Sequence, residues 1–192
     1  MKISCLSFIF FCTLTIYSQN NFGVFAGVSN TTLTDGFFRQ VNIEKAFTFH
    51  VGGLYEHTFN KTISFRPKLV LSLQGDIEKT KDSPFFTGQI DYKLTYLNVP
   101  LDFKFFSKPY IIIGPQIGLL LFTNKSERDY GDLDSNFDYG LNFGVGYEFK
   151  NIFIEANAYQ GINTILSLDS PSNSKLSITN TVLQLSLGYN FI

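Results

Sequence analysis

The feature that most constrains this chain is a two-residue alternation of large apolar residues with small or polar ones. The chain ends "TVLQLSLGYNFI", in which small or polar residues separate Leu183, Leu185, Leu187, Tyr189 and Phe191. Successive side chains of a β-strand point to opposite faces. The pattern therefore predicts a strand with one apolar face and one small or polar face.

Eight segments of the chain alternate in this way, and residues typical of turns separate them. They cover approximately 21–30, 46–59, 62–75, 89–105, 109–123, 136–149, 151–164 and 178–192. No stretch keeps the apolar spacing of a helix beyond a turn or two. Most segments exceed the about 9–11 residues that a tilted strand needs to cross a bilayer. We expect one all-β domain over residues 20–192.

The connections between these segments alternate in length. Short ones lie at "FNKT", "FFSKPY" and "FKN", and long polar ones lie around 31–45, 76–88, 124–135 and 165–177. Short turns at one end and long loops at the other are typical of outer-membrane barrels. This arrangement places the short turns and both ends of the domain in the periplasm and the long loops outside.

The two faces of the segments predict which side of the barrel meets lipid. In "SFRPKLVLSLQ", Phe65, Leu69 and Leu71 share one face, and Arg66 and Lys68 share the other. The lumen of an eight-stranded barrel has room for little beyond side chains. A continuous apolar belt must therefore point outward, and lipid is the solvent that favours this. The predicted fold is an eight-stranded antiparallel transmembrane up-and-down β-barrel in the outer membrane.

The first residues have the pattern of a secretory signal peptide. Residues 1–19 contain Lys2, an apolar run from Ile3 to Ile16 and a short polar end. Both cysteines, Cys5 and Cys12, lie in this segment. The mature chain then has no thiol for a disulfide, a nucleophile or a zinc site. Without Lys2, 14 basic residues remain against 16 acidic ones, which excludes a strongly basic nucleic-acid binder.

Seven stretches of the sequence occur in the order found in one family. They are "FGVFAGVSNTTL", "FHVGGLYEHTF", "SFRPKLVLSLQG", "LTYLNVPLDFKF", "KPYIIIGPQIGLLL", "YGLNFGVGYEF" and "LSLGYNF". Over about residues 21–192 the chain resembles the small outer-membrane beta-barrel domain of Bacteroidetes type, the PorT-like group. The most specific piece is "YLNVPL". The resemblance implies an eight-stranded outer-membrane barrel, and some members support secretion and gliding machinery. It implies no catalytic motif and no cofactor.

Charged residues recur on the face expected to line the lumen. They are Glu56, Arg66, Lys68, Asp102, Lys104, Glu148 and Glu155. Buried charges need partners, so we expect an internal salt-bridge network that fills the barrel. Pairing of Arg66 or Lys68 with Asp102 is favoured, because their strands are adjacent. The alternative interpretation is a polar path for an ion or a small solute.

The two histidines of the mature chain do not form a paired metal site. His50 and His57 are seven residues apart and so face opposite sides of a regular strand. We expect His50 on the lumen face and His57 on the outer face. His57 could serve as a base in a lipid-modifying enzyme, but a structural role at the membrane interface is favoured.

Three further features carry expectations of their own. The pairs Phe37–Phe38 and Phe85–Phe86 stand in two long loops, where they would form an aromatic girdle or contact a partner. Tyr189 and Phe191 resemble the C-terminal signal by which the barrel-assembly machinery recognises its substrates. A shift in the alternation near Pro100 predicts a β-bulge.

We therefore expect a non-catalytic membrane scaffold or interaction protein, for example an accessory of an envelope or secretion complex. Its expected partners are outer-membrane lipid, the barrel-assembly machinery and an envelope protein. The alternatives are a narrow channel and an outer-membrane lipid-modifying enzyme.

Overall fold

The computed structural model describes residues 20–34, 47–79, 89–125, 135–169 and 175–191. The expected signal peptide and the loop residues Phe37, Phe38, Phe85 and Phe86 lie outside these ranges. The strands are β1 (Asn20–Thr34), β2 (Phe47–Thr58), β3 (Ile63–Lys79), β4 (Gln89–Phe105), β5 (Tyr110–Lys125), β6 (Phe137–Phe149), β7 (Ile152–Gly161), β8 (Leu166–Asp169) and β9 (Lys175–Phe191). Among the described residues, no helix is long and apolar enough to cross a membrane.

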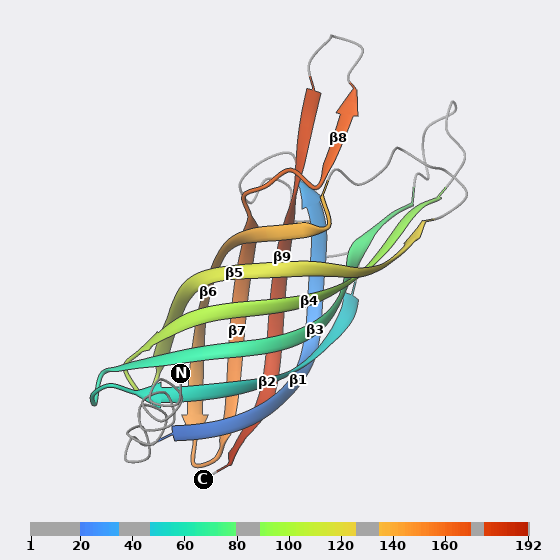
Figure 1. Cartoon of the computed structure of the whole chain (residues 1–192). Helices are drawn as coiled ribbons and strands as arrows, with labels where there is room; N and C mark the ends of the chain where they lie inside the picture. Colours follow the sequence, from blue (N-terminus) through green and yellow to red (C-terminus); the bar gives the residue numbers. More distant parts are fainter. Residues whose placement is uncertain (1–19, 35–46, 80–88, 126–134, 170–174, 192) are drawn as a thin grey trace, which may run out of the picture.

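Eight of these strands close into a barrel. Every neighbouring pair is antiparallel, in the order β1 to β7 and then β9, and β9 pairs again with β1. The closing seam runs from Phe22 opposite Phe191 to Thr34 opposite Thr179. Figure 1 shows the resulting tilted cylinder. Closure removes the free strand edges of the wall, and the predicted eight-stranded up-and-down barrel is confirmed.

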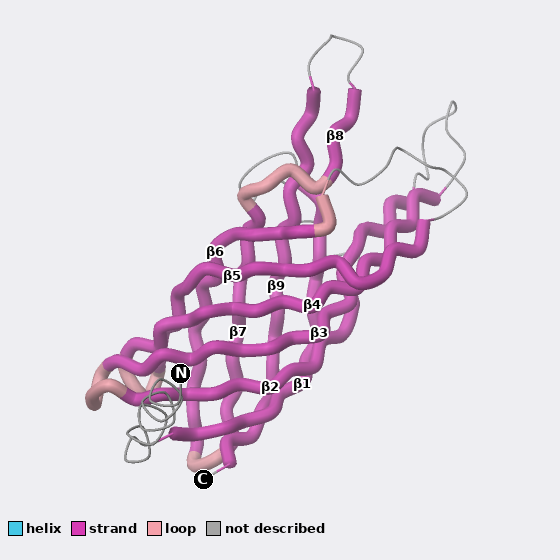
Figure 2. The backbone as a smooth tube through the Cα atoms, in the orientation of Figure 1, coloured by secondary structure: helices cyan, strands magenta, loops and turns pink. Residues whose placement is uncertain are grey.

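The short and long connections lie at opposite ends of the cylinder. The turns after β2, β4 and β6 gather at one end, together with the start of β1 and the end of β9 (Figure 2). At the other end, β8 pairs with Lys175–Ile178 of β9 and forms a hairpin beyond the wall. The sequence predicted a long polar connection over 165–177; within it, the structure places β8 and the first residues of β9.

The large apolar side chains form a belt on the outside of the wall. Phe137, Tyr139, Leu141, Phe143, Val145, Tyr147 and Phe149 of β6 are all exposed. The residues between them point inward, and several are glycines. A Cβ on Gly146 would lie 2.2 Å from Cζ of Tyr110, so glycine at this position gives the inward ring its space. The sheet is therefore apolar outside and tightly packed inside.

The β-bulge predicted near Pro100 is present in the pairing of β4 with β5, but it does not lie at Pro100 itself. Burial alternates without interruption from Leu94 to Lys104, and Pro100 pairs with Gln116. The pairing of β4 with β5 shifts instead between Thr95 and Tyr96. Leu94 and Tyr96 point into the lumen. Because they are as large as the outward residues, the sequence pattern suggested that the strand changes face after them.

Candidate functional site

The charged residues predicted for the lumen all lie on the inner face of the wall, toward the short-turn end. Glu56 comes from β2, Arg66 and Lys68 from β3, Asp102 and Lys104 from β4, Glu148 from β6 and Glu155 from β7. Arg66 and Asp102 have no solvent exposure. Period-two alternation is what points these side chains inward, because their strand neighbours form the outer belt.

Glu155 is the centre of this lumen cluster. Its carboxylate accepts hydrogen bonds from Arg66 Nη1 at 3.1 Å, Lys68 Nζ at 2.5 Å, Tyr110 Oη at 3.0 Å and Asn157 Nδ2 at 2.9 Å. In the closed strand order, β7 stands opposite β3. The bonds from Arg66 and Lys68 therefore span the lumen from one wall to the other.

Lys104 forms a second bridge at the short-turn end. Its ammonium lies 2.9 Å from Glu56 Oε1 and 3.0 Å from Glu148 Oε2. Arg66 Nε lies 3.5 Å from Glu56 Oε2 and joins the two halves of the cluster. Cations and carboxylates thus alternate around the inside of the barrel, as buried charges require.

Asp102 pairs with Lys68 rather than with Arg66. Lys68 Nζ lies 2.9 Å from Asp102 Oδ2, although Arg66 is the residue directly opposite Asp102 in the strand register. Asn142 Nδ2 donates to Asp102 Oδ1 at 2.9 Å. The adjacent-strand pairing of Asp102 with one of the two β3 cations is present, and Arg66 turns to Glu155 and Glu56.

Aromatic and apolar side chains fill the space beside the charges. The Arg66 guanidinium lies 4.5 Å from the ring centre of Phe153 and 5.2 Å from that of Tyr110. Cation–π contacts of this kind are stronger where water is excluded. Phe153 belongs in turn to a buried apolar cluster with Phe25, Leu54 and Val70. The described lumen is therefore packed with side chains at this level.

His50 lies in the lumen and bridges two serines, while His57 lies near the short turns. His50 Nδ1 and Ser29 Oγ are 2.8 Å apart, as are His50 Nε2 and Ser186 Oγ. All three residues are buried. His57 Nδ1 lies 3.1 Å from Asn20 Oδ1. Both expected faces are observed, and Ser29 and Ser186 are partners that the sequence analysis missed.

A smaller polar group occupies the lumen toward the long-loop end. Asn180 Nδ2 donates to Gln74 Oε1 at 2.5 Å and to Asp138 Oδ2 at 3.1 Å. Asp138 is buried between the outward residues Phe137 and Tyr139 of β6, so strand alternation accounts for its inward position. Gln74 and Asn180 are uncharged, so the search for charged lumen residues did not select them. The alternation along their strands nevertheless places both side chains on the inner face.

Tyr189 and Phe191, the expected insertion signal, lie on the outer face at the end of β9. Their ring centres are 5.5 Å apart, and both side chains are about half exposed. Recognition by the assembly machinery stays a prediction. Within the described ranges, no three His, Cys, Asp or Glu residues are placed to hold a metal ion.

A closed wall with an apolar exterior and a charged, filled interior defines a transmembrane β-barrel of the outer-membrane class. The family model for the outer membrane protein beta-barrel domain matches residues 17–167. The chain belongs to this family, and its location is the outer membrane.

Solved structures of outer-membrane proteins are similar to this chain at low sequence identity. OprG from Pseudomonas aeruginosa is 15% identical, with a TM-score of 0.48 over 91% of this chain and 97% of OprG. Neisserial surface protein A is 15% identical, with a TM-score of 0.46 over 90% and 97%. Ail from Yersinia pestis, in complex with the heparin analogue sucrose octasulfate, is 18% identical, with a TM-score of 0.45 over 91% and 99%. A search of curated proteins found no match.

Proposed function

We propose that the protein is a non-catalytic outer-membrane scaffold or interaction protein whose lumen conducts no solute. The observation that carries this proposal is the set of ion pairs that cross the lumen. Arg66 and Lys68 reach Glu155 on the opposite wall, and Lys104 reaches Glu56 and Glu148. Opening a path would separate these charges in a confined space, which costs several kcal/mol or so per stranded ion.

The resemblance to the PorT-like group supports an accessory role in an envelope or secretion complex. In this proposal the barrel anchors the chain in lipid, and the long loops contact an envelope protein. The residues proposed for that contact are Phe37, Phe38, Phe85 and Phe86, which lie outside the described residues.

The geometry at His50 favours a structural role over a catalytic one. Both ring nitrogens contact serine hydroxyls, so neither is available for the carboxylate that would orient a catalytic base. The two serines and His50 are at most 3% exposed, which closes them to a lipid substrate.

Planar-bilayer recording separates the scaffold from a channel. Purified protein should show no stable open state. Sustained ion-selective currents, with a selectivity altered by Arg66→Ala or Glu148→Ala, would reject the filled lumen and establish the channel.

A capture experiment tests the interaction role. Tagged protein is recovered from solubilised outer membranes as the unaltered chain and as the Phe85→Ser, Phe86→Ser double variant. A matched double variant changes Phe37 and Phe38. An envelope protein retained by the unaltered chain and lost with one pair supports the proposal. If the unaltered chain and both double variants retain the same envelope protein equally well, these phenylalanine pairs do not form the contact.

A further inference from the structure

Two adjoining depressions interrupt the outer belt on the side formed by β9, β1, β2 and β3, with Ile152 of β7 at the edge of the second. The first has a volume of about 600 Å³ and is lined by Ala26, Gly27, Val28, Phe49, His50, Val51, Leu71 and Leu73. The second has a volume of about 460 Å³ and is lined by Val24, Phe25, Ala26, Val51, Ile152, Leu187, Gly188 and Tyr189. Ala26 and Val51 line both depressions, so together they form one groove, which we call the Ala26 groove.

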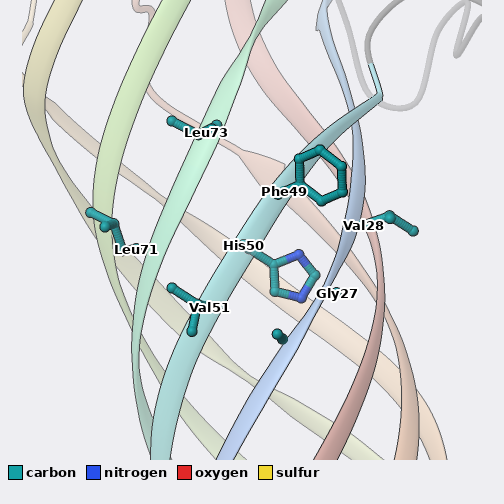
Figure 3. A pocket seen from close by; sticks show the side chains of 8 residues that line it. Gly27, Val28, Phe49, His50, Val51, Leu71 and Leu73 are labelled. Atoms are coloured by element: carbon teal, nitrogen blue, oxygen red, sulfur yellow. The ribbon is translucent and has the colours of Figure 1, made fainter.

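The small size of Ala26 creates the junction of the groove. Ala26 points outward on β1, between Val51 of β2 and Leu187 of β9 in the strand register. Figure 3 shows the first depression, with Phe49, Val51, Leu71 and Leu73 standing around it. By contrast, the outward residues of β6 are all large. The belt is thus hollow at Ala26 and full on β6.

The lining of the groove is mainly apolar, and the Tyr189 hydroxyl is its one outward-facing polar side-chain group among the described residues. Its side chains are aliphatic or aromatic apart from those of His50 and Tyr189. Both His50 nitrogens are engaged by Ser29 and Ser186 inside the lumen, and Tyr189 Oη accepts a hydrogen bond from Asn151 at the turn. A polar headgroup would find little to recognise here, whereas a hydrocarbon chain would find contact on each side.

The groove is continuous with the established interface between the barrel and lipid. A hollow in a lipid-facing wall cannot be filled by water, and an empty one would forfeit dispersion contacts along its lining. Each depression is within the about 300–1,000 Å³ range of small-molecule sites. The extension of the groove across five strands suits a long, narrow occupant.

We propose that the Ala26 groove binds one acyl chain of a membrane lipid and holds it more tightly than the rest of the belt holds its surrounding lipid. The gain comes from dispersion contacts between the chain and the lining of the groove, because an acyl chain in a bilayer has already left water and close packing is what favours apolar association there. This inference does not depend on the closed lumen or on the loop contacts.

The test places the mature chain in phosphatidylcholine nanodiscs that contain a phosphatidylethanolamine with a diazirine in one acyl chain. After illumination, mass spectrometry maps the cross-linked residues. Labelling at Val28, Val51 and Leu187 should exceed labelling at Leu141 and Val145 of β6 severalfold. Labelling spread evenly around the belt would overturn the proposal.

Two matched variants locate the bound chain. Ala26→Leu fills the junction of the groove from outside, and Ala156→Leu makes the same change on the outer face of β7, at a position that lines neither depression. Ala26→Leu should reduce groove labelling to the level of β6, and Ala156→Leu should not. Equal labelling in the two variants would contradict the proposal. If Ala26→Leu fails to fold, the comparison of groove and belt in the unaltered chain still decides.

Discussion

At the scale of single residues, Glu155 connects the two sides of the lumen. Its carboxylate accepts hydrogen bonds from Arg66 and Lys68 of β3, from Tyr110 of β5 and from Asn157 of β7. Removing one partner of a buried ion pair destabilises the folded protein, because the other charge is left buried without compensation. Loss of this one carboxylate would leave two cations in the lumen with fewer counter-charges.

We expect Glu155→Gln to lower the free energy of unfolding by about 3 kcal/mol, the low end for breaking a buried ion pair. The low end applies because each cation retains another carboxylate partner: Lys68 still pairs with Asp102, and Arg66 still pairs with Glu56. The measurement is a urea titration in phospholipid vesicles, read from the shift between folded and unfolded bands on an unheated gel.

Glu148→Gln is the matched control. Its side chain is 17% exposed and its partner Lys104 also bonds Glu56, so we expect a loss of about 1 kcal/mol or less, as for partly solvated pairs. Equal losses of unfolding free energy in the two variants would show that the bonds across the lumen stabilise the barrel no more than a partly exposed ion pair does.

The sequence was sufficient to place these charges on the inner face but not to pair all of them. Alternation fixes the face of each residue, and adjacency suggested Lys68 with Asp102. The bonds from Arg66 to Glu155 join strands that are far apart in the chain. They depend on the curvature and stagger of the closed barrel, which no local pattern encodes.

At the scale of strands, glycine and aromatic residues of neighbouring strands fit together on the inner face of the wall. Tyr110 of β5 occupies the space left by Gly146 of β6, and Phe153 of β7 occupies the space left by Gly188 of β9. A Cβ at Gly188 would lie 2.2 Å from Cζ of Phe153. The small residues of the inner face are therefore as necessary to the wall as its large outer ones.

A double-mutant cycle tests this fit. Gly146→Ala should cost about 1–3 kcal/mol, the range for overpacking a dense core, because its new methyl group overlaps Tyr110. In a Tyr110→Ala background the same change should cost much less. Unfolding in urea gives both values, and simple additivity would count against the steric account.

Two predictions about the strands differed from the structure, namely the position of the bulge in β4 and the connection that contains β8. In β4 the alternation did not show which residues face the lumen and which face lipid. Leu94 and Tyr96 are large and apolar like the belt residues, yet they point inward at a level where the lumen accepts apolar side chains. The short strand β8 was missed because it lies in a segment that reads as a polar loop. Its partner, Lys175–Ile178, extends β9 beyond the wall.

The orientation of the strands is tested by cysteine labelling on whole cells. Ser107 lies in the short turn after β4, and Asn136 lies at the opposite end, beside the start of β6. An impermeant maleimide should label Asn136→Cys and leave Ser107→Cys unlabelled until the outer membrane is permeabilised. The reverse pattern would invert the barrel in the membrane.

At the scale of the whole molecule, the separation of side chains between the two faces of the barrel wall accounts for the fold, the lumen cluster and the Ala26 groove. Apolar side chains face lipid, and charge, glycine and buried aromatic rings face inward. Most of this separation was readable from the sequence, because period two and the number of segments fix it. The depth of packing and the hollow at Ala26 were not, since both arise from side chains on strands brought together by closure.

The most direct test of this separation is a nitroxide scan along β6, from Phe137 to Phe149, in lipid vesicles. Each residue in turn is replaced by a spin-labelled cysteine, and its collision rate with oxygen, which concentrates in lipid, is measured. The account predicts a two-residue period with maxima at Tyr139, Leu141, Phe143, Val145 and Tyr147. A flat profile, a period near 3.6 residues, or maxima at the inward positions would contradict it.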